Sequence, residues 1–240
     1  MNAPLYAPRP VGTAGAGAAV LDAGLRRYML SVYNYMAAGL GVTGLVAYAA
    51  VATGFYQQIA ATPLIWVVML APLAAVLFLS LRIERISIGT AQAVFWGFAA
   101  IMGLSLAGIL LMYTGTSVAR VFFISAGTFA AMSLYGYTTN RDLSRFGSFL
   151  FMGLIGIILA SVVNIFVASS ALQFAISVIG VLLFTGLTAY DTQRIKQVYL
   201  TAGAGGDLAK SALMGALTLY LDFINLFVML LQLTGDRRGR

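Results

Sequence analysis

Two aspartates lie inside long apolar segments of this sequence: Asp191 in AYDTQRIK and Asp222 in LYLDFINLF. A carboxylate at the centre of a membrane helix costs about 2.5 to 3.5 kcal/mol on insertion scales, so such a residue needs a partner or a function. If the two side chains face each other, they would share one proton and titrate as a unit, which would sense acid without a histidine. The protonated pair would hold two helices together, and full ionisation would part them or admit a cation.

The composition restricts other chemistry. The 240 residues include no cysteine and no histidine, which excludes disulfides, thiolate metal sites and imidazole ligands. Carboxylates suit Ca²⁺, but Asp191 and Asp222 fall short of the about 6 to 8 oxygens of a tight site, so they predict a weak, transient Ca²⁺ site. No phosphate-binding loop, metalloprotease helix or nucleophile triad is recognisable. We therefore expect no cofactor and no enzymatic activity.

Membrane helices must position the two acids. Hydrophobic residues make up 61% of the chain and charged residues 9%, against roughly 25% charged in an ordinary soluble domain. The sequence predicts an all-α, polytopic membrane protein, a single seven-helix bundle with the lipid bilayer as its partner. The expected spans, at about 17 to 25 apolar residues each, are 29–53, 64–81, 91–112, 118–138, 147–167, 172–195 and 211–231.

Basic residues collect before the first span and on alternate joints after it. Arg26 and Arg27 precede the first span, and the positive-inside rule places them and the N-terminus in the cytoplasm. The net charge of +7 is then explained by topology, and we expect no nucleic-acid binding. The basic residues that follow spans two, four and six are Arg82, Arg85, Arg141, Arg145, Arg194, Lys196 and Lys210.

The chain divides into three parts. We expect residues 1–24 to be a disordered cytoplasmic tail, 25–235 the membrane domain and 236–240 a short C-terminal tail. A complete seventh crossing places this last tail outside, whereas a re-entrant helix would return it to the cytoplasm. We favour the complete crossing because the apolar run is long enough and uninterrupted.

The two acids lie on consecutive antiparallel spans joined by the glycine-rich segment 202–207, so helix rise puts them at similar depth. Tyr190, Tyr220 and Asn225 are candidate hydrogen-bond partners for them. The alternative for Asp191 is an interfacial residue, and for Asp222 a hydrogen-bonded structural acid.

A guanidinium at the end of the second span could pair with Asp191 and act as a latch on the cytoplasmic mouth. Arg82 and Arg85 are the candidates. The alternative is that they anchor the helix at the membrane surface.

At the two acid segments, 189–196 and 219–227, the sequence resembles the Bax inhibitor-1 (TMBIM) family, in particular its bacterial members. With the seven spans and the arginine-bearing joints, the resemblance covers roughly residues 25–235. It implies a central C-terminal helix wrapped by the other six, a diaspartyl pair at Asp191 and Asp222, and an arginine partner from the second span, either Arg85 or Arg82. Family members are similar to pH-sensitive Ca²⁺ leak channels, and other relatives look like modulators of a membrane-bound AAA protease or suppressors of cell death.

We therefore expect a pH-sensitive cation (Ca²⁺) leak channel of the bacterial cytoplasmic (inner) membrane. The alternative is a non-conducting regulator of membrane proteins, such as a membrane-bound AAA protease, acting through its cytoplasmic tail. An intramembrane aspartyl protease would also use two membrane aspartates, but its Gly-x-Gly-Asp motif is not present at Tyr220-Leu221-Asp222.

Overall fold

The computed structural model describes residues 13–202 and 207–239, with side chains from residue 22 onward. The described chain consists of helices joined by short turns and has no β-strand. The helices are α1 (Thr13–Ala52), α2 (Phe55–Ala60), α3 (Leu64–Arg82), α4 (Ile88–Met112), α5 (Gly115–Thr138), α6 (Ser144–Val167), α7 (Ser170–Thr201) and α8 (Leu208–Thr234).

Seven of these helices are long and apolar enough to cross a membrane, which confirms the expected polytopic all-α fold. The seventh, α8, is one continuous helix of 27 residues, which is long enough for the expected complete crossing. The first candidate span is Asp22–Ala52, inside a helix that begins at Thr13 and therefore overlaps the segment 1–24 expected to be a tail. Residues 1–12 of that tail, and 203–206 of the glycine-rich joint, lie outside the described residues.

Polar caps set several helix starts a few residues earlier than the apolar runs indicated. The side chains of Ser87, Thr114, Ser169 and Asp207 each accept a hydrogen bond from the backbone N–H three residues later. Such caps satisfy the free donors of a first helical turn, whose residues are often too polar to be counted as a span. The short helix α2 was not expected, because six residues are too few to show as an apolar run.

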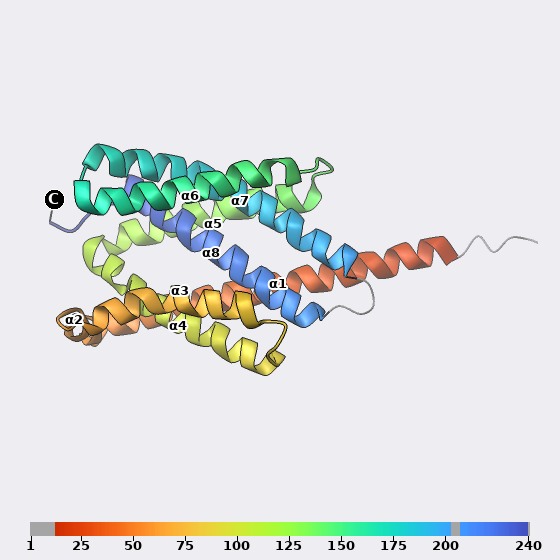
Figure 1. Cartoon of the computed structure of the whole chain (residues 1–240), viewed down its shortest axis with the longest axis horizontal. Helices are drawn as coiled ribbons and strands as arrows, with labels where there is room; N and C mark the ends of the chain where they lie inside the picture. Colours follow the sequence, from red (N-terminus) through yellow and green to blue (C-terminus); the bar gives the residue numbers. More distant parts are fainter. Residues whose placement is uncertain (1–12, 203–206, 240) are drawn as a thin grey trace, which may run out of the picture.

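Helix α8 lies at the centre of the bundle, as the resemblance implied. It packs against α1, α3, α4, α5 and α7, and 61% of its most apolar window is buried, against 39% or less for the other spans. Figure 1 shows α8 crossing diagonally between the α3–α4 pair and the α6–α7 pair. Helix α6 packs on α7 at the edge of the bundle.

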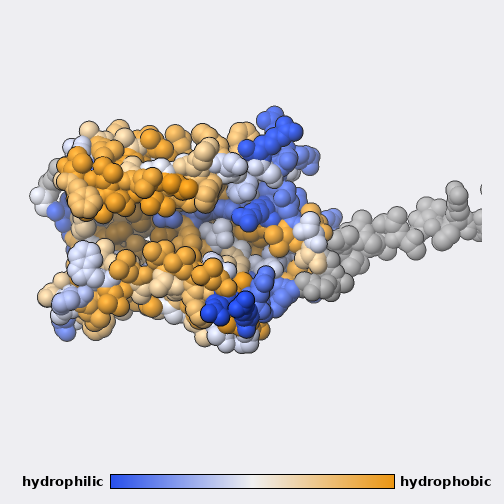
Figure 2. Space-filling view, viewed as in Figure 1, coloured by the Kyte–Doolittle hydropathy of each residue, from blue (hydrophilic) through white to orange (hydrophobic). Residues whose placement is uncertain are grey.

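The bundle has two chemically different ends. The α3–α4, α5–α6 and α7–α8 joints meet at one end, which we call the basic end because Arg82, Arg85, Arg141, Arg145 and Lys210 lie there or beside it. Hydrophilic side chains gather at this end in Figure 2, whereas the lateral face is covered by apolar ones. This surface is the one expected of a bundle immersed in lipid.

The C-terminal residues are fastened at the opposite end, in a contact we call the C-terminal clasp. The Thr114 N–H donates to the Asp236 carbonyl (3.0 Å), and the Arg238 N–H donates to the Met112 carbonyl (2.9 Å), which ties the chain end to the α4–α5 joint. The Asp236 carboxylate also forms an ion pair with Arg120 at 3.0 Å. The α8 helix is therefore held at its C-terminal end by both backbone and charge.

Candidate functional site

The two membrane aspartates lie together at the contact between α7 and α8. Asp191 is 8% exposed and Asp222 is 5% exposed, and their side chains lie next to each other on the wall of one cavity. Two carboxylates have no donor to share, and Asp222 Oδ2 is buried without a hydrogen-bond partner among the described residues. One proton held between the two carboxyl groups would supply the missing donor.

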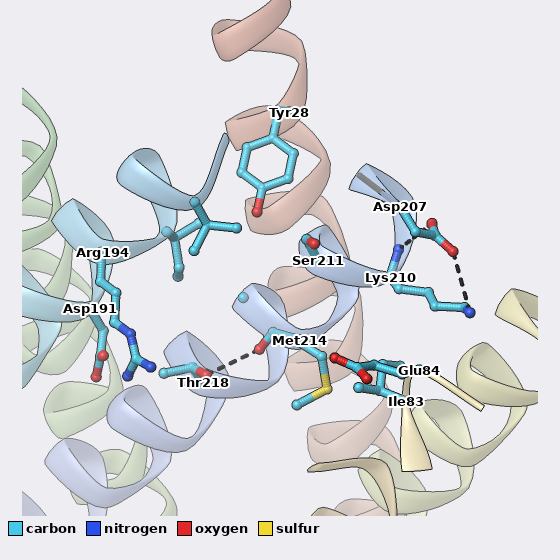
Figure 3. A pocket seen from close by; sticks show the side chains of 13 residues that line it. Tyr28, Ile83, Glu84, Asp191, Arg194, Asp207, Lys210, Ser211, Met214 and Thr218 are labelled. Atoms are coloured by element: carbon cyan, nitrogen blue, oxygen red, sulfur yellow. Dashed lines mark hydrogen bonds and ion pairs between the residues drawn. The ribbon is translucent and has the colours of Figure 1, made fainter. Parts of the chain in front are cut away.

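Two cavities flank this pair. The first, which we call the joint cavity, measures about 520 Å³ and lies beside the α7–α8 joint (Figure 3). The second, the α6 cavity, measures about 530 Å³ and lies between α6, α7 and α8. Asp191 lines both cavities, whereas Asp222 lines only the α6 cavity. Asp191 is therefore the part of the pair that can be reached from either side.

The guanidinium beside the pair belongs to Arg194, one helical turn after Asp191. Arg194 lines both cavities, and its positive charge acts on the Asp191 carboxyl through space. Figure 3 shows the two side chains next to each other on α7, close to Thr218 of α8. The sequence carried the signal, an Asp and an Arg three positions apart on one helix face, but Arg194 was assigned only to the membrane surface.

The structure does not bring Arg82 or Arg85 to the acids. Both side chains are exposed, and neither lines the two cavities. Helix α3 ends at Arg82, and the turn after it directs Ile83 and Glu84 toward the joint cavity instead. Arg82 or Arg85 would therefore have to move in order to pair with Asp191. Arg194 already lies beside the Asp191 carboxyl.

The three expected hydrogen-bond partners differ in their surroundings. Tyr220 is fully buried, and its hydroxyl bonds to the Thr43 hydroxyl at 2.6 Å, so it joins α8 to α1 and does not serve the acids. Asn225 lines the α6 cavity together with Asp222. Tyr190 lines the same cavity and packs against Gly147 of α6.

Other residues of the segment 189–196 fasten α7 to the rest of the bundle on either side of Asp191. The Thr192 hydroxyl bonds to Ser133 on α5 (3.0 Å), which in turn bonds to Tyr33 on α1 (2.6 Å). Lys196 donates to the Tyr137 carbonyl (2.8 Å) and lies over the Tyr137 ring. Thr192 and Lys196 thus both fasten α7 to α5.

Gln193 holds the α5–α6 joint with both ends of its amide. It accepts from the Leu143 N–H (2.9 Å) and donates to the Arg141 carbonyl (2.8 Å).

We expect Gln193→Ala to lower the free energy of unfolding by about 2 kcal/mol, because the buried Leu143 N–H loses its acceptor. Thermal unfolding in detergent measures this, with the exposed Gln197→Ala on the same helix as control. Equal stability of the two variants would contradict the expectation.

No full metal site is present at the acids. Among the described residues, no group of three or more His, Cys, Asp or Glu side chains could hold a metal ion. Asp191 and Asp222 supply four carboxyl oxygens at most, fewer than the about 6 to 8 that Ca²⁺ takes in a tight site. A bound cation here would keep much of its water.

Comparison with known proteins identifies the family. The family model described as "Inhibitor of apoptosis-promoting Bax1" matches residues 25–239. The chain belongs to the Bax inhibitor-1 family. This confirms the resemblance seen at the two acid segments, and it extends over all seven spans.

Several bacterial proteins match about nine tenths of this chain. A Rickettsia prowazekii protein is 50% identical over 90% of this chain and 92% of its own length. The inner membrane protein YbhL of Escherichia coli is 47% identical, over 90% of this chain and 94% of its own. A membrane protein of Streptococcus pyogenes is 36% identical over 89% of this chain and 94% of its own.

Proposed function

We propose that this protein lets cations, Ca²⁺ among them, leak across the bacterial inner membrane, and that the Asp191–Asp222 pair makes the leak depend on pH. The observation that carries the proposal is the buried contact between the two carboxyl groups, with cavities on both sides. Intramembrane acids that face a cavity mark ion and proton pathways. The relative YbhL, named an inner membrane protein, supports the location.

The pair would work through its proton. With one proton shared, the carboxyl groups attract each other and hold α7 against α8. With both ionised, the two negative charges repel in a low-dielectric site, and either the helices separate or a cation enters between them. Arg194 would stabilise the ionised Asp191 from the side of the joint cavity.

A continuous row of positions on α8 supports a path along the α7–α8 contact. Asp222, Asn225, Met229 and Gln232 follow one another at spacings of three and four, which places them on one helix face. Met229 packs directly onto Gly180 of α7, so an apolar contact separates the acids from the far end of the row. Apolar constrictions of this kind close pores by excluding water.

Polar side chains lie beyond that constriction. The Gln173 amide donates to Gln232 (2.8 Å) and accepts from Asn164 (3.1 Å), beside a cavity of about 670 Å³. These groups offer amide oxygens to a cation at the end opposite the acids. The path would thus have polar ends and an apolar closure.

The orientation follows from charge. The basic end carries the arginines and lysines of three joints, so the positive-inside rule places it in the cytoplasm. The joint cavity, and with it Asp191, would then face the cytoplasm, and the leak would respond to cytoplasmic pH.

Ion flux into proteoliposomes tests the proposal. We expect Ca²⁺ flux through the wild type to change between about pH 5 and about pH 8, as expected of two buried carboxyl groups that titrate as a unit, and flux through Asp222→Asn to be independent of pH. The control is Asp142→Asn, since the backbone N–H of Ser144 holds the pKa of Asp142 below its usual range and this exposed carboxyl is ionised throughout. Unchanged pH dependence in both Asp191→Asn and Asp222→Asn would refute the mechanism.

A second function is regulation of another membrane protein without conduction. The observation in its favour is that α1 runs on past the other helices at the basic end, where a partner could bind it (Figure 1). Cross-linking in native membranes, with full-length chain and a variant that starts at residue 22, separates the two functions. A partner captured by the full chain alone, together with no flux in proteoliposomes, would favour regulation.

A further inference from the structure

A long apolar groove lies between α1 and α5, away from both acids. It measures about 650 Å³, and Phe223 of α8 forms part of its floor. Helices α1 and α5 each pack on α8, and the Tyr33 hydroxyl reaches Ser133 between them. Because these two hydroxyls bond to each other, the groove interior has little need of a polar ligand.

The groove opens sideways, toward lipid. Leu30 at one wall is 51% exposed, and Leu134 at the other is 63% exposed. Both belong to segments that span the membrane. What enters this groove must therefore come from the bilayer or from another membrane-embedded chain.

The positive charge lies at one end of the groove. Arg26 lines that end, at the start of the first span, and no acidic residue lines the groove. Lys196 lies over the ring of Tyr137, another lining residue. The groove thus has a cationic end beside the membrane surface and an apolar remainder, which matches the polarity of an anionic phospholipid.

The groove runs lengthwise along α1. Its lining extends from Arg26 to Leu40, which is about 21 Å at 1.5 Å per residue, and it has a guanidinium at one end only. An extended acyl chain that carries an anionic headgroup at one end matches this arrangement of apolar surface and charge.

We propose that the groove binds one acyl chain of an anionic phospholipid, with the lipid phosphate at Arg26. The site is independent of the acid pair, because none of its lining residues lines the two cavities beside Asp191. It would give the bundle a lipid-specific contact on α1 and α5.

Native mass spectrometry of the delipidated protein in detergent tests this, with phosphatidylglycerol and phosphatidylcholine of identical acyl chains as probes. We expect one phosphatidylglycerol per chain, bound about fivefold more tightly than phosphatidylcholine, which corresponds to about 1 kcal/mol per basic residue near an anionic lipid. Arg26→Gln should remove this preference. The matched control is Arg27→Gln, since Arg27 is exposed next to Arg26 but does not line the groove.

Substitutions that fill the groove with a larger side chain test whether it binds an acyl chain. Ala130→Phe should weaken binding of both lipids, whereas Ala131→Phe, at an exposed neighbour outside the groove, should not. If Ala130→Phe fails to fold, Ala37→Phe on the opposite wall replaces it, with Ala38→Phe as its control. The proposal would be overturned if the wild type bound the two lipids with equal affinity, or if the Phe variant and its control bound lipid equally well. It would also be overturned if the groove-filling variant broke a protein dimer, because the groove would then be a protein interface.

Discussion

We expect the double variant, with Asp191→Asn and Asp222→Asn, to alter the pH dependence of the Ca²⁺ leak no more than Asp222→Asn alone does. Independent sites give additive effects, whereas groups that share a proton titrate as a unit and lose their response together. The amide of Asp222→Asn would also donate to Asp191 at every pH, so the α7–α8 contact would no longer depend on a shared proton. We expect the single and double variants to agree within about twofold in the ratio of flux at the two ends of the pH range.

The same variants can be measured without any flux. Thermal unfolding across pH should show a pH-dependent stability in the wild type that is reduced to the same extent in Asp222→Asn and in the double variant. Asp142→Asn, at an exposed joint, should follow the wild type. If the two asparagines instead remove two separate, equal portions of the pH response, the acids act independently and the shared proton is excluded.

Gly136→Ala is expected to cause the largest loss of stability, about 3 kcal/mol. A Cβ at Gly136 of α5 would meet the backbone of Ala189 on α7, with the Ala189 carbonyl carbon and Cα both at 2.9 Å. Backbone atoms cannot rotate aside as a side chain can, so α5 and α7 would have to separate. Because Ala189 lies two residues before Asp191, the acid pair would shift as well.

A matched glycine on the same helix gives the control. A Cβ at Gly127 would meet nothing within 4 Å, so Gly127→Ala should be neutral or should stabilise α5 by up to about 1 kcal/mol through helix propensity. Thermal unfolding of both variants in the same detergent measures the difference. Equal melting temperatures would show that α5 and α7 are not in close backbone contact.

The seven spans could be predicted from the sequence because a membrane helix needs about 20 apolar residues and little else. The juxtaposition of Asp191 and Asp222 was only a hypothesis, since hydropathy carries no information on how a helix is rotated about its axis. The structure resolves this rotation: Asp191 faces α8, while Thr192 and Gln193 face α5 and the α5–α6 joint.

Two expectations about neighbours of the pair did not match the geometry, for related reasons. Arg82 and Arg85 were considered because they end a helix on the same side, yet both are exposed and neither lines the cavities beside the acids. Tyr220 lies only two positions before Asp222, which places it on a different face of α8, where it bonds to Thr43. The angle of a residue around its helix axis therefore predicted contact with the acids better than its distance along the chain. Arg194 lies close to Asp191 because the two residues are three positions apart and share one face of α7.

The C-terminal clasp has a mechanical consequence for α8. A helix fastened at one end cannot slide along its own axis as a piston, so it can move at the other end only by swinging about the fixed one. Asp222 lies twelve residues before Thr234, the last residue of α8, about 18 Å from this pivot, and a swing of about 10° would carry it about 3 Å. The clasp therefore makes α8 a lever whose free arm bears Asp222, and a small tilt of α8 is enough to make or break the contact of Asp222 with Asp191 on α7.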